Sequence, residues 1–118
     1  MTTVEVLRKA KQAVIELGWQ QGQYRKTETE GPCCALGACL VAVGAKLRRG
    51  YSGIDEYSAD PETMEAFVRA RRLLEKAVGG VVVWKWNDTP GRTQDEVLAA
   101  FDRAIALAEA ARTQGDRR

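Results

Sequence analysis

Apolar residues between positions 3 and 17 recur every three or four residues, which is the spacing of one helix face. Charged and amide residues occupy most of the other positions in this stretch. Thr2 or Thr3 can cap the first turn, and Gly18 can end the last one. The pattern predicts an amphipathic helix over Thr3–Leu17 with one buried side, formed by Val4, Leu7, Ala10, Val14 and Leu17.

The next apolar stretch, Cys33–Ala45, shows no such face, because it is apolar all round. A helix of this kind is normally surrounded by protein. We therefore predict a central helix over Cys33–Lys46, with Pro32 at its entrance. The stretch is short of the roughly 20 residues that cross a bilayer, so we expect a buried helix and no membrane anchor.

Two further helices have clear start signals. Asp60 followed by Pro61 is typical of a helix cap and first turn, and Gly79-Gly80 marks the end of that helix. Thr93 and Glu96 have capping-box spacing, which predicts the start of the last helix. The tail, residues 113–118, is polar and is expected to fray.

Val81–Trp86 is the best strand candidate, because three valines and two tryptophans favour extended backbone. In a strand, Trp84 and Trp86 would face the same way, with Lys85 opposite. A single strand needs a partner. Three alternatives remain open: pairing with part of the Tyr51–Tyr57 loop, pairing with another copy of the chain, or lying extended over the helices.

Two loops separate these elements, over Gly18–Pro32 and over Lys46–Ala59. The first is longer than usual for a link between helices, which makes it a candidate wall of a site. The predicted fold is mainly α: a compact four-helix domain with a short extended segment near Val81–Trp86. Residues 1–118 are expected to form a single domain.

The charge balance and the absent residue types limit the classes of function that fit this chain. The 118-residue chain has 18 basic and 16 acidic residues, a formal net charge of +2. This gives no strong field for nucleic acid or for a membrane. The chain contains no histidine, which excludes Cys–His and Ser–His–Asp catalysis. Glycine-rich phosphate-loop spacing is also absent.

The three cysteines, Cys33, Cys34 and Cys39, do not have zinc-ligand spacing. We expect no metal and no cofactor. Cys33 and Cys34 have two interpretations: one of them is a thiol activated by a helix N-terminus, or they are small apolar residues that begin a buried helix. The unpaired thiol and the absence of a leader-like N-terminus favour a cytoplasmic setting.

Amide, carboxylate and guanidinium groups lie close together in Trp86-Asn87-Asp88 and Arg92. They could bind a ligand or orient a water. Alternatively they form a structural corner, with Arg92 paired to Asp88 and the turn backbone hydrogen-bonded by Asn87 or Asp88. The candidate ligand or partner residues are Trp19, Cys34, Trp84, Trp86, Asn87, Asp88 and Arg92.

A second candidate surface is basic. Lys46, Arg48 and Arg49 precede Tyr51, and basic residues beside an aromatic ring can bind single-stranded nucleic acid. The alternative is an ordinary solvated surface, which the neighbouring acidic residues favour.

Several fragments occur in an order that resembles a family of small, uncharacterised proteins of actinobacteria and their bacteriophages. The fragments are Gly18-Trp19 with Gly22, Cys34–Ala38, Trp86-Asn87-Asp88, Arg92-Thr93 and Glu96–Leu98. The resemblance extends from about Leu7 to Ala108. Where such proteins often have a cysteine after the first tryptophan, this chain has Gln20. The family has no assigned activity, so the resemblance implies a setting in an actinobacterial or phage-infected cytoplasm and no mechanism.

These observations favour a small, non-enzymatic protein-binding or regulatory protein, phage-encoded and acting on a host component. A second copy of the chain is another expected partner. The alternatives are a small-ligand binder or enzyme with a pocket near Trp86-Asn87-Asp88, and a weak nucleic-acid binder.

Overall fold

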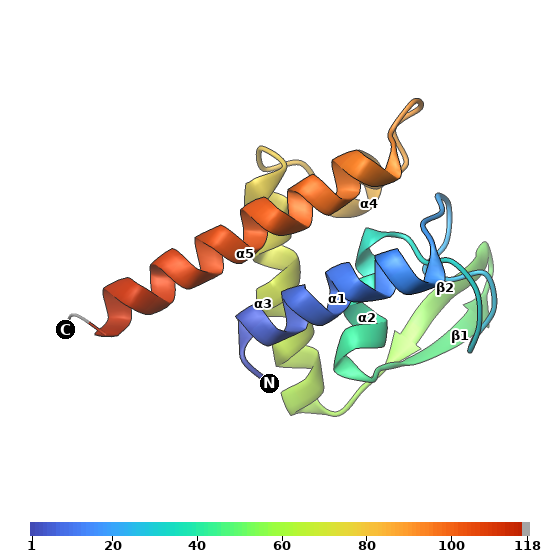
Figure 1. Cartoon of the computed structure of the whole chain (residues 1–118). Helices are drawn as coiled ribbons and strands as arrows, with labels where there is room; N and C mark the ends of the chain where they lie inside the picture. Colours follow the sequence, from blue (N-terminus) through green and yellow to red (C-terminus); the bar gives the residue numbers. More distant parts are fainter. Residues whose placement is uncertain (117–118) are drawn as a thin grey trace.

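The computed structural model of the protein describes residues 1–116, which form five helices and a two-stranded antiparallel sheet (Figure 1). The chain is mainly helical, as predicted, but the expected count of four helices is wrong. In order, the elements are α1 (Thr3–Leu17), α2 (Ala35–Val43), β1 (Lys46–Gly50), β2 (Gly53–Ser58), α3 (Pro61–Ala77), α4 (Val83–Asn87) and α5 (Gln94–Asp116).

Helix α1 has the predicted bounds. The Thr2 hydroxyl accepts a hydrogen bond from the Glu5 backbone N–H at 3.1 Å, and the Glu5 carboxylate accepts one from the Thr2 N–H at 3.5 Å. This capping box satisfies donors at the helix start. Gly18 ends the helix with a φ of 92°, a conformation that favours glycine.

Helix α2 is central, as predicted, but shorter. Residues 35–40 are all buried, and the helix contacts α1, α3, α4 and β1. It starts at Ala35 because Cys34 is the cap: its sulfur accepts a hydrogen bond from the Gly37 N–H at 3.3 Å. Pro32 therefore lies outside the first turn. Gly44 ends the helix in the left-handed region.

The predicted starts of α3 and α5 are confirmed. Asp60 Oδ1 accepts a hydrogen bond from the Thr63 N–H at 2.8 Å. At α5 the Thr93 hydroxyl accepts one from the Glu96 N–H at 3.2 Å, and Glu96 accepts one from the Thr93 N–H at 3.0 Å. Side-chain caps of this kind act locally, which is why the sequence reveals them.

The segment Lys46–Ala59, expected to be a loop, instead contains the β1–β2 hairpin. Its register pairs Lys46 with Ser58 and Gly50 with Gly53, with an irregularity between Arg48 and Arg49. The hairpin is held to the core by the buried side chains of Leu47 and Ile54, while Lys46, Arg48, Glu56 and Ser58 stay exposed. This pattern is only one or two residues long on each strand, too short to stand out in the sequence.

The predicted strand at Val81–Trp86 is wrong, because the segment turns into the short helix α4 at Val83. Val83 and Asn87, four residues apart, are both fully buried, so the buried positions have helical spacing. Trp84 is therefore exposed and Trp86 half-buried, and the two rings do not share a face. Tertiary packing overrides the local β preference.

One hydrophobic core includes residues from all four longer helices, α4 and both strands. Figure 1 shows the C-terminal part of α5 extending beyond the other helices. The helix continues to Asp116, so its regular structure reaches further into the predicted frayed tail than expected; residues 117–118 of that tail lie outside the described residues. Within residues 1–116, no helix has the length and apolarity to cross a membrane.

Candidate functional site

Asn87 is the only buried polar or charged side chain in the core formed by the described residues, with none of its surface exposed. Its Oδ1 accepts hydrogen bonds from the Trp19 indole N–H at 2.7 Å and from the Ala35 backbone N–H at 3.0 Å. Its Nδ2 donates to the Gln20 carbonyl at 3.2 Å and to Asp88 Oδ1 at 3.0 Å. Both acceptor positions and both donor hydrogens of the amide are thus used within the chain.

Asp88 and the loop residues Gln21 and Gly22 extend this hydrogen-bond network. Asp88 Oδ1 also accepts a hydrogen bond from the Gly22 N–H at 3.0 Å. The Gln21 side-chain amide donates to the backbone carbonyls of Asn87 and Thr89, each at 3.0 Å. We call this set, residues 19–22 with Asn87 and Asp88, the Asn87 clamp. It fixes the long loop after α1 to α4 and to the start of α2.

Two later residues of that loop, Gln23 and Tyr24, form hydrogen bonds with the hairpin. The Tyr24 N–H donates to the Ile54 carbonyl at 2.8 Å, and the Ile54 N–H donates to Gln23 Oε1 at 2.8 Å. The Tyr24 backbone also passes so close to α2 that a Cβ on Gly37 would lie 1.7 Å from its carbonyl oxygen. This part of the loop is therefore held by hydrogen bonds to β2 and by close packing against α2.

Trp86 and Arg92 form a second, separate contact. The Arg92 guanidinium lies over the Trp86 ring at 4.1 Å, and its Nε donates to the Trp86 carbonyl at 2.9 Å. Arg92 also pairs with Glu96 at 3.0 Å. The expected pairing of Arg92 with Asp88 is not what the structure shows, because the turn at Pro90-Gly91 directs the guanidinium back over the tryptophan. This contact stabilises the junction between α4 and α5.

All three cysteines are buried and free. Burial raises the pKa of the Cys33 thiol to about 11 and that of Cys34 to about 12. Burial also raises the pKa of Cys39. The position of Cys34 at a helix N-terminus, which by itself would lower its pKa, is outweighed by the loss of solvent. The thiols are therefore protonated at neutral pH and lack the thiolate that a nucleophile requires.

A small cavity of about 160 Å³ opens beside the Asn87 clamp. We call it the α4 pocket. Its floor and walls come from the loop after α1, the start of α2, strand β2 and α4. It is lined by Gly22, Gln23, Tyr24, Cys34, Leu36, Asp55, Trp84 and Asp88.

Three exposed apolar residues lie at the start of α4, and one of them, Trp84, lines this cavity. Val81 is 44%, Val82 45% and Trp84 51% exposed, within four consecutive residues. We call these three residues the α4 patch. Exposed large apolar side chains are ordinary when scattered, but a group of them indicates a contact surface.

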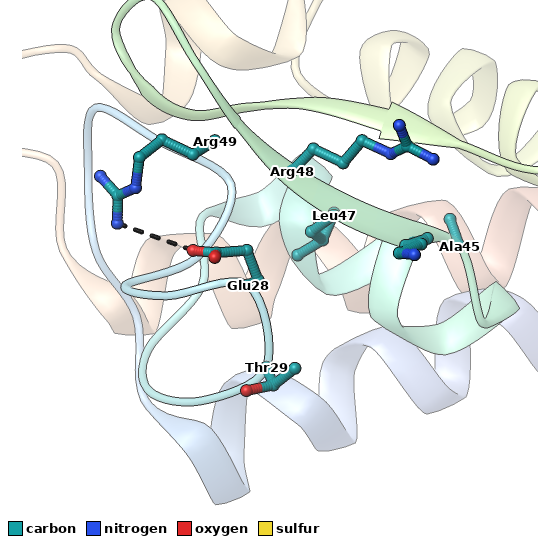
Figure 2. Close-up of a pocket in the computed structure, with 7 residues that line it drawn as sticks. Glu28, Thr29, Ala45, Leu47, Arg48 and Arg49 are labelled. Atoms are coloured by element: carbon teal, nitrogen blue, oxygen red, sulfur yellow. Dashed lines mark ion pairs between the residues drawn. The ribbon is translucent and has the colours of Figure 1, made fainter.

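The basic surface predicted from the sequence lies on the hairpin. An open groove of about 600 Å³ is lined by Glu28, Thr29, Ala45, Lys46, Leu47, Arg48 and Arg49. Figure 2 shows Arg49 directed at Glu28, with which it forms an ion pair at 3.6 Å, and Arg48 directed away from that pair. Arg48 is paired in register with Glu56. Tyr51, at the hairpin turn, is fully exposed.

The structure therefore divides the candidate residues into groups. Trp19, Cys34, Asn87 and Asp88 meet at the Asn87 clamp or the α4 pocket, whereas Trp86 and Arg92 form their own contact. Trp84 reaches the α4 pocket from the solvent side. The sequence reading missed Tyr24 and Asp55, which belong to loop-like segments far from α4 along the chain. The unusual length of the loop over Gly18–Pro32 had marked it as a candidate site wall, and Gly22, Gln23 and Tyr24 of this loop line the α4 pocket.

The chain was compared with known proteins. A family described as a family of unknown function (DUF6197) matches residues 1–107, a stretch that includes the Asn87 clamp, the α4 pocket and the hairpin. No curated protein and no solved structure matches the chain. The expectation of an uncharacterised family is thus confirmed, and the chain belongs to DUF6197.

Proposed function

We propose that the protein is a non-enzymatic binding protein that holds a protein partner on the α4 patch. The observation that carries the proposal is that three exposed apolar residues, Val81, Val82 and Trp84, lie within four consecutive positions of the chain. Burying apolar surface is the main favourable term in most protein association. Tryptophan is also enriched among the residues that dominate binding energy.

The occupied polar groups support a binding role over a catalytic one. The Asn87 amide is the best candidate for orienting a substrate or a water. Its hydrogen-bond donors and acceptor are all satisfied by groups of the same chain. The cysteines have raised pKa values. These residues build a rigid platform under α4, and a preorganised surface loses less entropy when it binds.

The sequence resemblance supplies the setting of the proposal. In an actinobacterial or phage-infected cell, the partner is a host protein in the cytoplasm. A second copy of the chain is the other occupant that would fit the α4 patch, and sedimentation of the purified protein distinguishes the two cases. If the protein sediments as a dimer and Trp84→Ala dissociates it, the occupant of the α4 patch is a second copy of the chain and not a host protein.

The test uses a photo-reactive amino acid at position 82 in the full-length protein, expressed in its own host. We expect a cross-link to one protein, lost in Trp84→Ala and kept in Ile15→Ala. Ile15 is the matched control, since it is 49% exposed and lies on α1. Trp86→Ala is not a suitable test, because the half-buried ring packs under Arg92. Equal cross-linking by the Trp84 and Ile15 variants would refute the proposal.

A second candidate function, weak binding of nucleic acid, is favoured by the basic groove in Figure 2. Lys46, Arg48 and Arg49 lie on one strand beside the exposed Tyr51. Glu28 and Glu56 offset much of this charge, so only weak, salt-dependent binding follows. Retardation of single-stranded DNA that falls with salt and with Arg48→Ala would support it. Absent or salt-insensitive retardation would remove it.

A further inference from the structure

The size of the α4 pocket limits what can enter it. At about 160 Å³ it is smaller than typical small-molecule sites, which hold roughly 300–1,000 Å³. This space suits the end of one side chain and excludes a nucleotide or a large cofactor.

The walls of the pocket are negatively charged, although the chain as a whole has a net charge of +2. Asp88 uses Oδ1 in the Asn87 clamp, whereas its Oδ2 has no hydrogen-bond partner among the described residues. Asp55 uses Oδ2 to accept from the Ser52 N–H at 2.8 Å. Its Oδ1 is buried over Gly50 without a partner. The free Asp88 carboxylate oxygen, together with the negative charge of Asp55 on the same lining, thus favours a cation.

The remaining walls are aromatic and apolar. Trp84, Tyr24 and Leu36 supply these surfaces, and the rest of the lining is Gly22, Gln23 and Cys34. The faces of aromatic rings attract cations, and Trp84 already has Lys85 over its ring at 5.5 Å. Among residues 1–116, no group of three acidic, cysteine or histidine side chains could hold a metal ion. The lining therefore matches an organic cation with an aliphatic stem.

We propose that the α4 pocket receives the side chain of a lysine from the protein docked on the α4 patch. This inference rests on the proposed function, because the same partner would cover Val81 and Val82 while its lysine enters beside Trp84. The aliphatic stem packs on Leu36 and Trp84, and the ammonium group reaches Asp88 Oδ2. A compact ammonium fits the narrow space better than a planar guanidinium.

The pocket is tested directly with n-butylammonium, which reproduces the end of a lysine, on the 15N-labelled full-length protein. The probe is the Trp84 indole N–H resonance, identified with Trp84→Phe. We expect a saturable shift of this resonance at constant ionic strength. 1-Butanol, the neutral analogue, should produce little shift. Equal shifts with butanol would show an apolar pocket only and would overturn the inference.

Asp88→Asn is the sharpest variant, because the amide keeps the Oδ1 acceptor used by the Gly22 N–H and removes only the charge. We expect n-butylammonium to bind at least about twofold more weakly, the scale of one solvent-accessible ion pair. Asp55→Asn should weaken it in the same direction. Glu62→Gln is the matched control, since this carboxylate lies in the first turn of α3 and lines no part of the pocket. Unchanged binding by Asp88→Asn would also overturn the inference.

Cross-linking at position 82 separates this inference from the proposed function. If the partner is still captured by Asp88→Asn with unchanged affinity, the α4 patch binds it without a lysine in the pocket, and only the inference fails. If Trp84→Ala leaves capture intact while n-butylammonium binds the wild type, the pocket takes a cation but the α4 patch is not the docking surface.

Discussion

The Trp19 indole N–H donates a hydrogen bond to Asn87 Oδ1 at 2.7 Å, joining two residues that are 68 positions apart. The same oxygen accepts from the Ala35 N–H, at the start of the central helix. One fully buried amide therefore links the loop after α1, helix α2 and helix α4. The exposed position of Trp84 depends on this link, because Asn87 fixes α4 in place.

Asn87→Ala should be strongly destabilising. It leaves the Trp19 indole N–H and the Ala35 N–H without their acceptor in a buried position. Each unsatisfied buried group costs about 1–3 kcal/mol, so we expect the free energy of unfolding to fall by roughly 3–5 kcal/mol. Urea unfolding measures this loss. Gln94→Ala is the control, since this side-chain amide makes no hydrogen bond within residues 1–116, and it should change stability by no more than about 0.5 kcal/mol.

Gly37→Ala should also destabilise the protein, although alanine has a higher helix propensity than glycine. Alanine is about 1 kcal/mol better than glycine inside a helix. Here the added Cβ would lie 1.7 Å from the Tyr24 carbonyl oxygen, so the loop must move. We expect a loss of at least about 3 kcal/mol, the upper end of overpacking costs. Ala99→Gly, at an exposed position of α5, is the control: it measures how much helix propensity alone changes the free energy of unfolding. A more stable Gly37→Ala variant would show that the loop is not held against α2.

The cysteines should react slowly in the folded protein. Burial raises the pKa of Cys33 to about 11 and that of Cys34 to about 12, so little thiolate exists near neutral pH. Alkylation followed by mass spectrometry should label all three cysteines quickly in denaturant and none quickly in native buffer. Fast native labelling of Cys34 would indicate that the helix N-terminus dominates over burial.

The raised thiol pKa values also predict a loss of stability in alkali. The unfolded chain ionises these thiols near the ordinary pKa of 9.0, whereas the folded chain keeps them neutral. Their contribution is complete below about pH 9 and is lost as the pH rises through the folded pKa values. Thermal melting across this range should show a falling Tm. A Cys33→Ala, Cys34→Ala double variant should show a smaller fall.

Glu96 should stabilise the start of α5 only when it is ionised. The hydrogen bond from the Thr93 backbone N–H holds the pKa of Glu96 below its ordinary value of 4.5. The stabilisation is therefore present above pH 4.5 and is lost as the pH falls through the folded pKa. Glu96→Gln should lower the Tm at neutral pH, and its difference from the wild type should shrink in acid. Asp95→Asn, in the same turn but outside the capping box, should have a smaller effect.

The candidate site was only partly predictable. The sequence identified Trp19, Cys34, Asn87 and Asp88, and the structure brings these residues together. It grouped Trp86 and Arg92 with them, although the turn after α4 places these two in a contact of their own. Tyr24 and Asp55 were missed, because their place on the pocket wall depends on how the loop after α1 packs against the hairpin.

The sequence by itself determined the features that act within a few residues. The caps at Thr2, Asp60 and Thr93, and the glycine that ends α1, are local hydrogen-bond and backbone effects. The uniformly apolar α2 also shows its central place, because no side of it can face water. These signals do not require knowledge of any distant residue.

Only the tertiary structure decided the hairpin, helix α4 and the α4 pocket. Residues 81–86 favour extended backbone locally, but burying Val83 and Asn87 on one side requires a helix. The buried amide is stable there because its partners come from residues 19, 20 and 35 as well as from its neighbour Asp88. Burial and hydrogen bonding between distant segments outweigh propensities of about 1 kcal/mol or less.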